Sequence, residues 1–175
     1  QLALLLAGDD RLLVTYQLGG PSELRVFSAD GRPQPAPRQG TIASVGGLAA
    51  TGKGDVIFHT ESYTQPGRYM RFNIETGDTE TTALVDGSPV DLSEIEVIRT
   101  TAKSKDGTKV PLNILLPKGA RAGGNRPCVV TGYGGYGISI APRFRAMDKV
   151  LLENGVVYVI ANLRGGGEFG EAWHR

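Results

Sequence analysis

An internal repeat in the first half of the chain restricts its fold more than any other feature. Short β-rich runs, broken by Gly, Pro, Asn and Asp, occur twice, and residues 1–86 show no helical periodicity. Equivalent positions lie 44 to 46 residues apart and are Leu13 and Ile57, Leu24 and Tyr69, and Gly31 and Gly77. We therefore predict about two antiparallel β-propeller blades over residues 1–88, because blades repeat at roughly this spacing with three or four strands each. A plain antiparallel meander is the alternative.

The pattern changes from about residue 89 onward. Two predicted strands, residues 96–104 and 109–116, flank an Asp106-Gly107 pair, which favours a tight hairpin turn. Pro111 cannot donate a hydrogen bond to a neighbouring strand, so the second of these strands is expected at or near the edge of a sheet.

The hairpin is followed by a predicted strand, a glycine-rich loop, a helix and another strand. Residues 128–131 form the first strand, in which Cys128 is expected to be a small buried core residue. The helix is predicted to begin near Pro142 and to end at Gly155. Its predicted apolar stripe consists of Phe144, Met147, Val150 and Leu151. Residues 156–161 are continuously apolar, which predicts a strand buried on both faces and paired in parallel with residues 128–131.

These patterns together predict a mixed fold with two domains. Antiparallel β-propeller blades are expected over residues 1–88, and the N-terminal part of an α/β sheet over residues 89–175. The sheet is still incomplete at Arg175, so we expect the chain to be a fragment of a larger protein.

Charge and composition argue against several classes of function. Nineteen Lys and Arg residues against eighteen Asp and Glu give a net charge of +1, with no basic stretch dense enough for nucleic acid or an anionic membrane. The longest apolar runs have about six residues, too few to cross a bilayer. With one cysteine, Cys128, and two histidines, His59 and His174, we expect neither an internal disulfide nor a metal site, and we expect no cofactor.

The glycine-rich loop after residues 128–131 has two interpretations. Gly132, Gly134 and Gly137 match the spacing of a dinucleotide fingerprint, and Arg164 after the next strand would suit a 2′-phosphate, as in an NADP-binding oxidoreductase. In such a site the helix starts inside the glycine motif, whereas here it is expected only near residue 142. In an α/β-hydrolase, the loop after the third strand supplies an oxyanion-hole donor, and the hydroxyl of Tyr133 could serve.

Three segments resemble the prolyl oligopeptidase family of serine peptidases. They are residues 104–111 (SKDGTKVP), 130–139 (VTGYGGYGIS) and 161–175 (ANLRGGGEFGEAWHR). The resemblance implies a β-propeller placed before the main part of an α/β-hydrolase domain, and hydrolysis of short peptides through a Ser-His-Asp acyl-enzyme mechanism. It also implies that the triad comes after Arg175, so the chain alone is expected to be inactive. Its partners would be a peptide substrate and the remainder of the same protein.

The resemblance assigns expected roles to particular residues. Tyr133 matches the tyrosine whose hydroxyl stabilises the oxyanion, and Tyr136 matches a substrate-pocket position that is usually Phe in prolyl oligopeptidases. Cleavage after proline is therefore expected, with an oligopeptidase B-like preference for basic residues as the alternative. The residues expected to support the site are Gly132, Gly134, Gly135, Arg164 and Glu168. Arg164 and Glu168 are expected to form a local ion pair that shapes the glycine turn.

Other candidate residues are given non-catalytic roles. Ser139 is not expected to be a nucleophile, because it lies in a long connection and not on a sharp strand-to-helix turn. His174 matches a Trp-His pair of the family that is distinct from its catalytic histidine, and His59 is expected to be structural. A non-catalytic interaction module built on propeller blades is a further alternative. A cytoplasmic and a periplasmic location both remain open.

Overall fold

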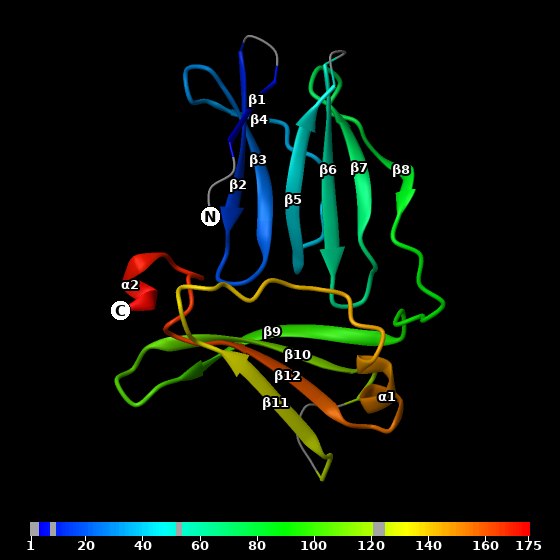
Figure 1. Cartoon of the computed structure of the whole chain (residues 1–175), viewed down its shortest axis with the longest axis vertical. Coiled ribbons are helices and arrows are strands. Elements are labelled where there is room, and N and C mark those ends of the chain that lie inside the picture. Colours follow the sequence, from blue (N-terminus) through cyan, green and yellow to red (C-terminus); the bar gives the residue numbers. More distant parts are fainter. Residues whose placement is uncertain (1–3, 8–9, 52–53, 121–124) are drawn as a thin grey trace. The chain divides into compact units, whose positions relative to one another are not determined.

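The computed structural model describes residues 4–7, 10–51, 54–120 and 125–175, and the chain divides into two compact units (Figure 1). The first unit contains residues 1–62, 66–87 and 141–143. The second contains residues 63–65, 88–140 and 144–175.

The described part of the first unit consists of two four-stranded antiparallel sheets, with strand orders β1-β2-β3-β4 and β5-β6-β7-β8. The strands of the first sheet are β1 (Leu4–Ala7), β2 (Arg11–Gln17), β3 (Ser22–Ser28) and β4 (Pro33–Gln34). The strands of the second sheet are β5 (Ala43–Ala50), β6 (Asp55–Ser62), β7 (Arg68–Asn73) and β8 (Thr79–Val85). The repeat of about 45 residues is thus a repeat of one antiparallel sheet. This confirms the predicted antiparallel strand direction and the predicted three or four strands in each repeat.

Alternating burial explains why these runs form strands with one face in a core. In β2 and β3 every second central residue is buried, because successive side chains of a strand point to opposite faces. The buried side chains of both sheets form one apolar cluster of Leu13, Leu24, Val26, Val45, Val56, Phe58 and Phe72. His59 lies in β6, as the sequence predicted, and its ring packs edge-on against Tyr69.

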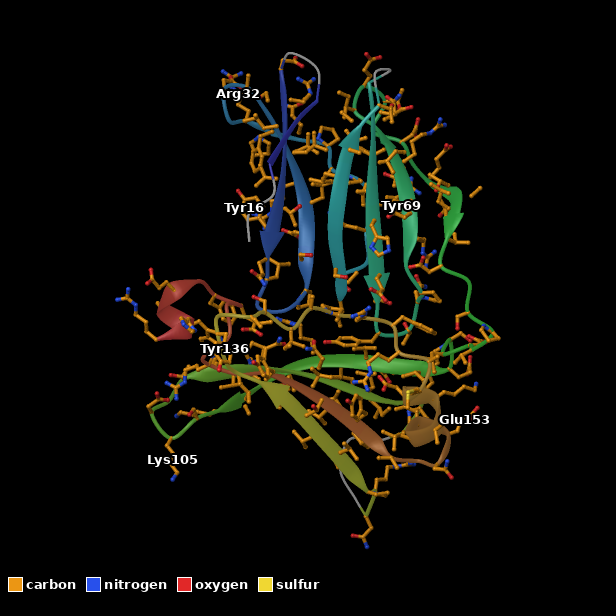
Figure 2. The ribbon with its side chains drawn as sticks, viewed as in Figure 1. Tyr16, Arg32, Tyr69, Lys105, Tyr136 and Glu153 are labelled. Carbon is orange, nitrogen blue, oxygen red and sulfur yellow. The ribbon has the colours of Figure 1, made fainter. Side chains whose placement is uncertain are left out.

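The second unit contains a mixed four-stranded sheet with the order β11-β12-β10-β9. Its elements are β9 (Ile95–Lys103), β10 (Lys109–Pro117), β11 (Cys128–Tyr133), α1 (Asp148–Glu153), β12 (Val157–Asn162) and α2 (Glu171–His174). β9 and β10 form the predicted antiparallel hairpin, with Lys105 at its tip (Figure 2). β11 and β12 pair in parallel, which confirms the predicted pairing of these two segments.

Pro111 lies in a strand next to the edge strand of the described sheet, which agrees with the prediction of a position at or near an edge. β10 lies inside the sheet, between β9 and β12. The pairing of β10 with β12 covers only Leu112 to Leu115, so Pro111 lies one residue outside it. The missing N–H of Pro111 therefore removes no hydrogen bond from that strand pair.

The predicted helix is much shorter than expected. It begins at Asp148 rather than near Pro142, and two residues of the predicted apolar stripe, Met147 and Val150, are 79% and 65% exposed. The residue before a proline disfavours helical geometry, which agrees with an irregular segment around Pro142. The predicted end is confirmed, because Gly155 has a left-handed φ of 74° after the last turn.

Burial differs between the two parallel strands. β12 is buried along most of its length, as predicted for residues 156–161. The expectation that Cys128 lies in a core was wrong, since its side chain is exposed, as is most of β11. Among the described strands, β11 is at the end of the sheet and has a single neighbour, so only one of its edges is covered.

Candidate functional site

Two glycine-rich segments meet where the parallel strands end. The first glycine segment, residues 132–137, begins within the last residues of β11, and the second glycine segment, residues 165–167, follows β12. The register pairs Gly132 with Ala161 and Tyr133 with Asn162, so both segments leave the sheet at the same edge. Ligands of α/β sheets gather at this edge, beyond the carboxyl ends of the strands.

The two segments pack backbone against backbone. A Cβ atom on Gly134 would lie within 3.0 Å of the carbonyl oxygen of Arg164, and one on Gly165 would lie equally close to the carbonyl oxygen of Gly134. The same conflict joins Gly167 to the carbonyl oxygen of Gly137. The amide of Gly137 also donates a hydrogen bond of 3.0 Å to the carbonyl of Gly165. Each segment therefore needs glycine where it lies against the backbone near the other segment, because a side chain there would collide with that backbone.

Tyr133 is the last residue of β11 and is 42% exposed. A Cβ atom on Gly135 would be 3.4 Å from the Tyr133 hydroxyl oxygen, so the phenol end of the ring lies beside this glycine. Within the described ranges the Tyr133 hydroxyl has no hydrogen-bond partner and is free to donate. The structure places Tyr133 at the end of β11, with Gly134 and Gly135 directly after it in the loop.

Tyr136 has an unusual backbone conformation. Its φ of 56° is the one positive value found at a non-glycine residue in the described part of the chain. The left-handed region costs an ordinary residue about 1 kcal/mol. Tyr136 is 88% exposed, and Figure 2 shows it in the loop that follows β11. The backbone strain at Tyr136 is a cost in free energy, and the turn leaves the Tyr136 ring outside the packed core. Strained residues of this kind gather at functional sites.

The predicted ion pair between Arg164 and Glu168 was wrong. The guanidinium of Arg164 pairs instead with the carboxylate of Asp106, in the turn between β9 and β10, and donates a hydrogen bond of 3.2 Å to the Ser104 hydroxyl. The pKa of Asp106 is lowered to about 2, mainly by the backbone N–H of Thr108 and then by Arg164. Arg164 therefore ties the second glycine segment to the hairpin, and Glu168 is left to other partners.

Glu168 is buried, with 1% of its surface exposed. Its Oε1 accepts hydrogen bonds from the backbone N–H of Ile140, at 3.0 Å, and from the side-chain amide of Asn162, at 3.2 Å. Asn162 also donates to the carbonyl of Ile140 at 2.7 Å. Glu168 thus binds the segment that leaves the first glycine segment, through contacts that differ from the expected ion pair.

Two residues of the last helix, Trp173 and His174, also hold the second glycine segment and the residues before it. The indole N–H of Trp173 donates to the carbonyl of Leu163 at 3.0 Å, and the Nδ1 atom of His174 lies 2.7 Å from the carbonyl oxygen of Gly165. These contacts give the Trp-His pair a place in the support of the loop. Ser139 lies in the irregular segment before α1, away from any sharp strand-to-helix turn.

Sequence reasoning missed three residues that build this site: Asp106, Asn113 and Asn162. The two asparagines are fully buried. A signal was present, because Asn is depleted in strands and Asn113 interrupts an otherwise apolar run. In the described ranges, no three or more His, Cys, Asp or Glu side chains are grouped so that they could hold a metal ion. No helix in the same ranges combines the length and apolar character that a membrane crossing requires.

Comparison with known proteins gives consistent matches. The model of the prolyl oligopeptidase family matches residues 142–175. A prolyl endopeptidase from Elizabethkingia meningoseptica is 31% identical over 172 residues, which are 95% of this chain and 24% of that protein. A dipeptidyl aminopeptidase BI from Pseudoxanthomonas mexicana is 32% identical over 170 residues, 95% of this chain and 23% of that protein.

A solved prolyl endopeptidase structure matches 99% of this chain and 26% of its own chain, with 32% identity and a TM-score of 0.85. This chain therefore spans about a quarter of the length of the proteins that it matches.

Proposed function

Because the chain belongs to the prolyl oligopeptidase family, we propose that it is part of a serine peptidase and that the first glycine segment lines its active site. The proposed reaction is hydrolysis of short peptides through an acyl-enzyme, with the Ser, His and Asp of the triad outside these 175 residues. The chain alone is then inactive.

The observation that carries the proposal is the place of Tyr133. Attack on a peptide carbonyl puts negative charge on its oxygen, and a donor aimed at that oxygen lowers the barrier. Among the residues that the structure describes, the Tyr133 hydroxyl has no acceptor, and it lies at the sheet edge where ligands gather, on a loop fixed by contact with the second glycine segment. A phenol donates one hydrogen bond through its O–H group.

The proposed domain organisation follows the two kinds of sheet. We assign residues 1–88 to β-propeller blades, supported by the repeated four-stranded antiparallel sheets. We assign residues 89–175 to the first part of an α/β-hydrolase domain, supported by the hairpin and the parallel pair β11–β12 with a connection that contains α1. We propose that the propeller restricts the substrates to short, unstructured peptides.

Cleavage on the carboxyl side of proline is the proposed specificity, and an exposed aromatic ring at Tyr136 supports it, because a flat apolar face suits the proline ring. Cleavage after basic residues is the second candidate. The two similar relatives carry different peptidase names, so likeness alone does not choose the substrate. The two specificities are distinguished by the initial rates of a complete enzyme that carries this segment, measured on matched chromogenic peptides with proline or arginine before the scissile bond.

An NADP-binding role has weaker support. Of the glycines that match the dinucleotide fingerprint, Gly134 and Gly137 lie against the second glycine segment, and Gly132 lies against Ala161 and Leu163. Arg164 is paired with Asp106. We accordingly propose no cofactor. Titration of the chain with NADPH, followed by nicotinamide fluorescence, is expected to show no binding.

The decisive experiment is Tyr133→Phe in a complete enzyme that carries this segment. The change keeps the ring and removes one donor, which typically costs about 3 kcal/mol, or roughly two orders of magnitude in rate. The loss is expected in kcat with little change in KM, since the bond forms mainly in the transition state.

Tyr136→Phe is the matched control for this experiment, because it removes a hydroxyl from the same loop. It is expected to alter KM and the choice of peptide, with kcat nearly unchanged. Full kcat of Tyr133→Phe on amide substrates would remove Tyr133 from the catalytic machinery.

A further inference from the structure

A line of polar side chains, one half-buried and three buried, crosses the sheet of the second unit. Arg99 on β9 donates to the Oδ1 atom of Asn113 on β10 at 3.2 Å, and the Nδ2 atom of Asn113 donates to the Oδ1 atom of Asn162 at 3.1 Å. Asn162, the last residue of β12, donates in turn to Glu168 at 3.2 Å. Asn113 and Asn162 are fully buried, and Glu168 nearly so.

The two ends of this line fix the direction of every hydrogen bond. The guanidinium of Arg99 can only donate, and at the far end the backbone carbonyl of Ile140, to which Asn162 also donates, can only accept. Asn113 must therefore turn its oxygen to Arg99 and its NH₂ group to Asn162, and Asn162 must repeat that orientation toward Glu168. Neither Asn113 nor Asn162 can rotate its side-chain amide by half a turn without placing two acceptors or two donors against each other.

The far end of the line holds the backbone next to Tyr133. Asn162 is the register partner of Tyr133 in the parallel pair β11–β12. Asn162 and Glu168 together bind both polar backbone groups of Ile140, three residues beyond the first glycine segment. The first glycine segment is thus fixed where it enters, through the sheet, and shortly after it ends, through these two side chains.

We propose that Arg99, Asn113, Asn162 and Glu168 form a one-directional hydrogen-bond relay that positions the first glycine segment, with Asn162 and Glu168 as positioning residues for Tyr133. The relay itself is independent of the proposed function, and only its effect on kcat rests on it.

Stability alone is a poor reason to keep this relay. Apolar side chains of similar size would pack β9, β10 and β12 without desolvating a charge, and buried ionic groups often add little net stability. Moreover, the Oε2 atom of Glu168 is buried and has no hydrogen-bond partner in the described ranges, which carries a cost. A fully directed polar network instead selects one conformation, which is what a positioned donor requires.

Asn113→Asp tests the direction of the relay at a distance from the loop. The new carboxylate still accepts from Arg99, but its second oxygen faces Asn162, which must turn its NH₂ group away from Glu168 and Ile140. We expect hydrogen exchange at the Ile140 amide to accelerate at least tenfold in the 175-residue chain. In a complete enzyme, kcat is expected to fall about tenfold while KM changes less than twofold. Asn125→Asp is the matched control, since it adds the same charge at an exposed position and is expected to change neither quantity.

A second pair of variants tests the loop end without altering the sheet. Glu168→Gln keeps an oxygen for Ile140 and Asn162, so the exchange rate of Ile140 is expected to stay within threefold of the wild-type rate. Glu168→Ala removes the acceptor and is expected to accelerate exchange at Ile140 at least tenfold, with kcat reduced and KM nearly unchanged.

The outcomes separate the two proposals. Unchanged exchange at Ile140 in Asn113→Asp, or equal exchange in the two Glu168 variants, overturns the relay. Faster exchange with unchanged kcat overturns the positioning of Tyr133. A wild-type complete enzyme that hydrolyses no peptide contradicts the proposed function, while the exchange measurements still decide whether the relay exists.

Discussion

Glycine serves different physical purposes in the two units of the chain. Gly31, in the turn between β3 and β4, has a φ of 84° and open space where a side chain would begin. Gly134, directly after β11, has no left-handed φ but has neighbouring backbone there, and Gly165, after β12, has both a φ of 93° and neighbouring backbone. Gly31 therefore needs the left-handed conformation, Gly134 needs the space that a side chain would fill, and Gly165 needs both. Glycine is therefore required for two different reasons in one chain, and substitutions can tell them apart.

Gly134→Ala is expected to have the largest effect. The new methyl group meets the carbonyl of Arg164, which is backbone and cannot rotate away, so one of the two segments must move. Overpacking of this kind costs up to about 3 kcal/mol. The free energy of unfolding from urea titration measures the loss. A loss below about 1 kcal/mol would mean that the two glycine segments separate easily.

Gly31→Ala is expected to cost about 1 kcal/mol, because an alanine in the left-handed region is strained although nothing blocks its side chain. Gly31→Asn should recover part of that loss, since Asn tolerates this conformation. The same titration applies. Equal losses for Gly31→Ala and Gly134→Ala would erase the distinction between conformation and space.

Gly46→Ala is expected to be neutral or to stabilise the protein by about 0.5 kcal/mol. Gly46, in β5, has neither a left-handed φ nor a neighbour within 4 Å of a built Cβ atom, so alanine mainly reduces the entropy of the unfolded chain. Its midpoint of urea unfolding provides the baseline for the other two substitutions. A clear destabilisation would show that a glycine of the first unit also has a packing role.

Arg164→Gln is expected to have the smallest effect and concerns the anchor of the second glycine segment. The pKa of Asp106 should rise only part of the way to its ordinary value, because the 3.1 Å hydrogen bond from Thr108 remains. A carboxyl with a lowered folded-state pKa stabilises the fold above its unfolded value of 3.8, and this is lost as pH falls through about 2. NMR titration of the Asp106 carboxyl carbon measures its pKa in the wild-type protein and in Arg164→Gln. An unchanged pKa would show that Arg164 contributes nothing to the anchor.

Features with a local cause were predictable from the sequence. The strands and their turns followed from alternating apolar residues and from pairs such as Asp106-Gly107, which specify a hairpin through their own backbone preferences. The parallel pairing of β11 with β12 followed from an apolar run at the right distance along the chain. The end of α1 at Gly155 followed from the same kind of local rule.

Features that depend on distant partners were not predictable. Arg164 and Glu168 are four residues apart, so a local ion pair was the natural expectation, yet Arg164 pairs with Asp106 from a hairpin 58 positions earlier. Asn113 and Asn162 meet only because the sheet places β10 beside β12. Cys128 was assigned to a core because strand burial was inferred from composition, whereas it depends on which elements cover the strand.

The contact between the glycine segments also determines what a saturation mutagenesis screen would report. Any side chain at Gly134, Gly165 or Gly167 collides with backbone, so such a screen would rank these positions as intolerant as a nucleophile. A map of tolerance alone would therefore outline a false catalytic centre made of residues that carry no functional group. Only shape-preserving changes, such as the loss of a single hydroxyl, distinguish the atoms that react from the atoms that leave room.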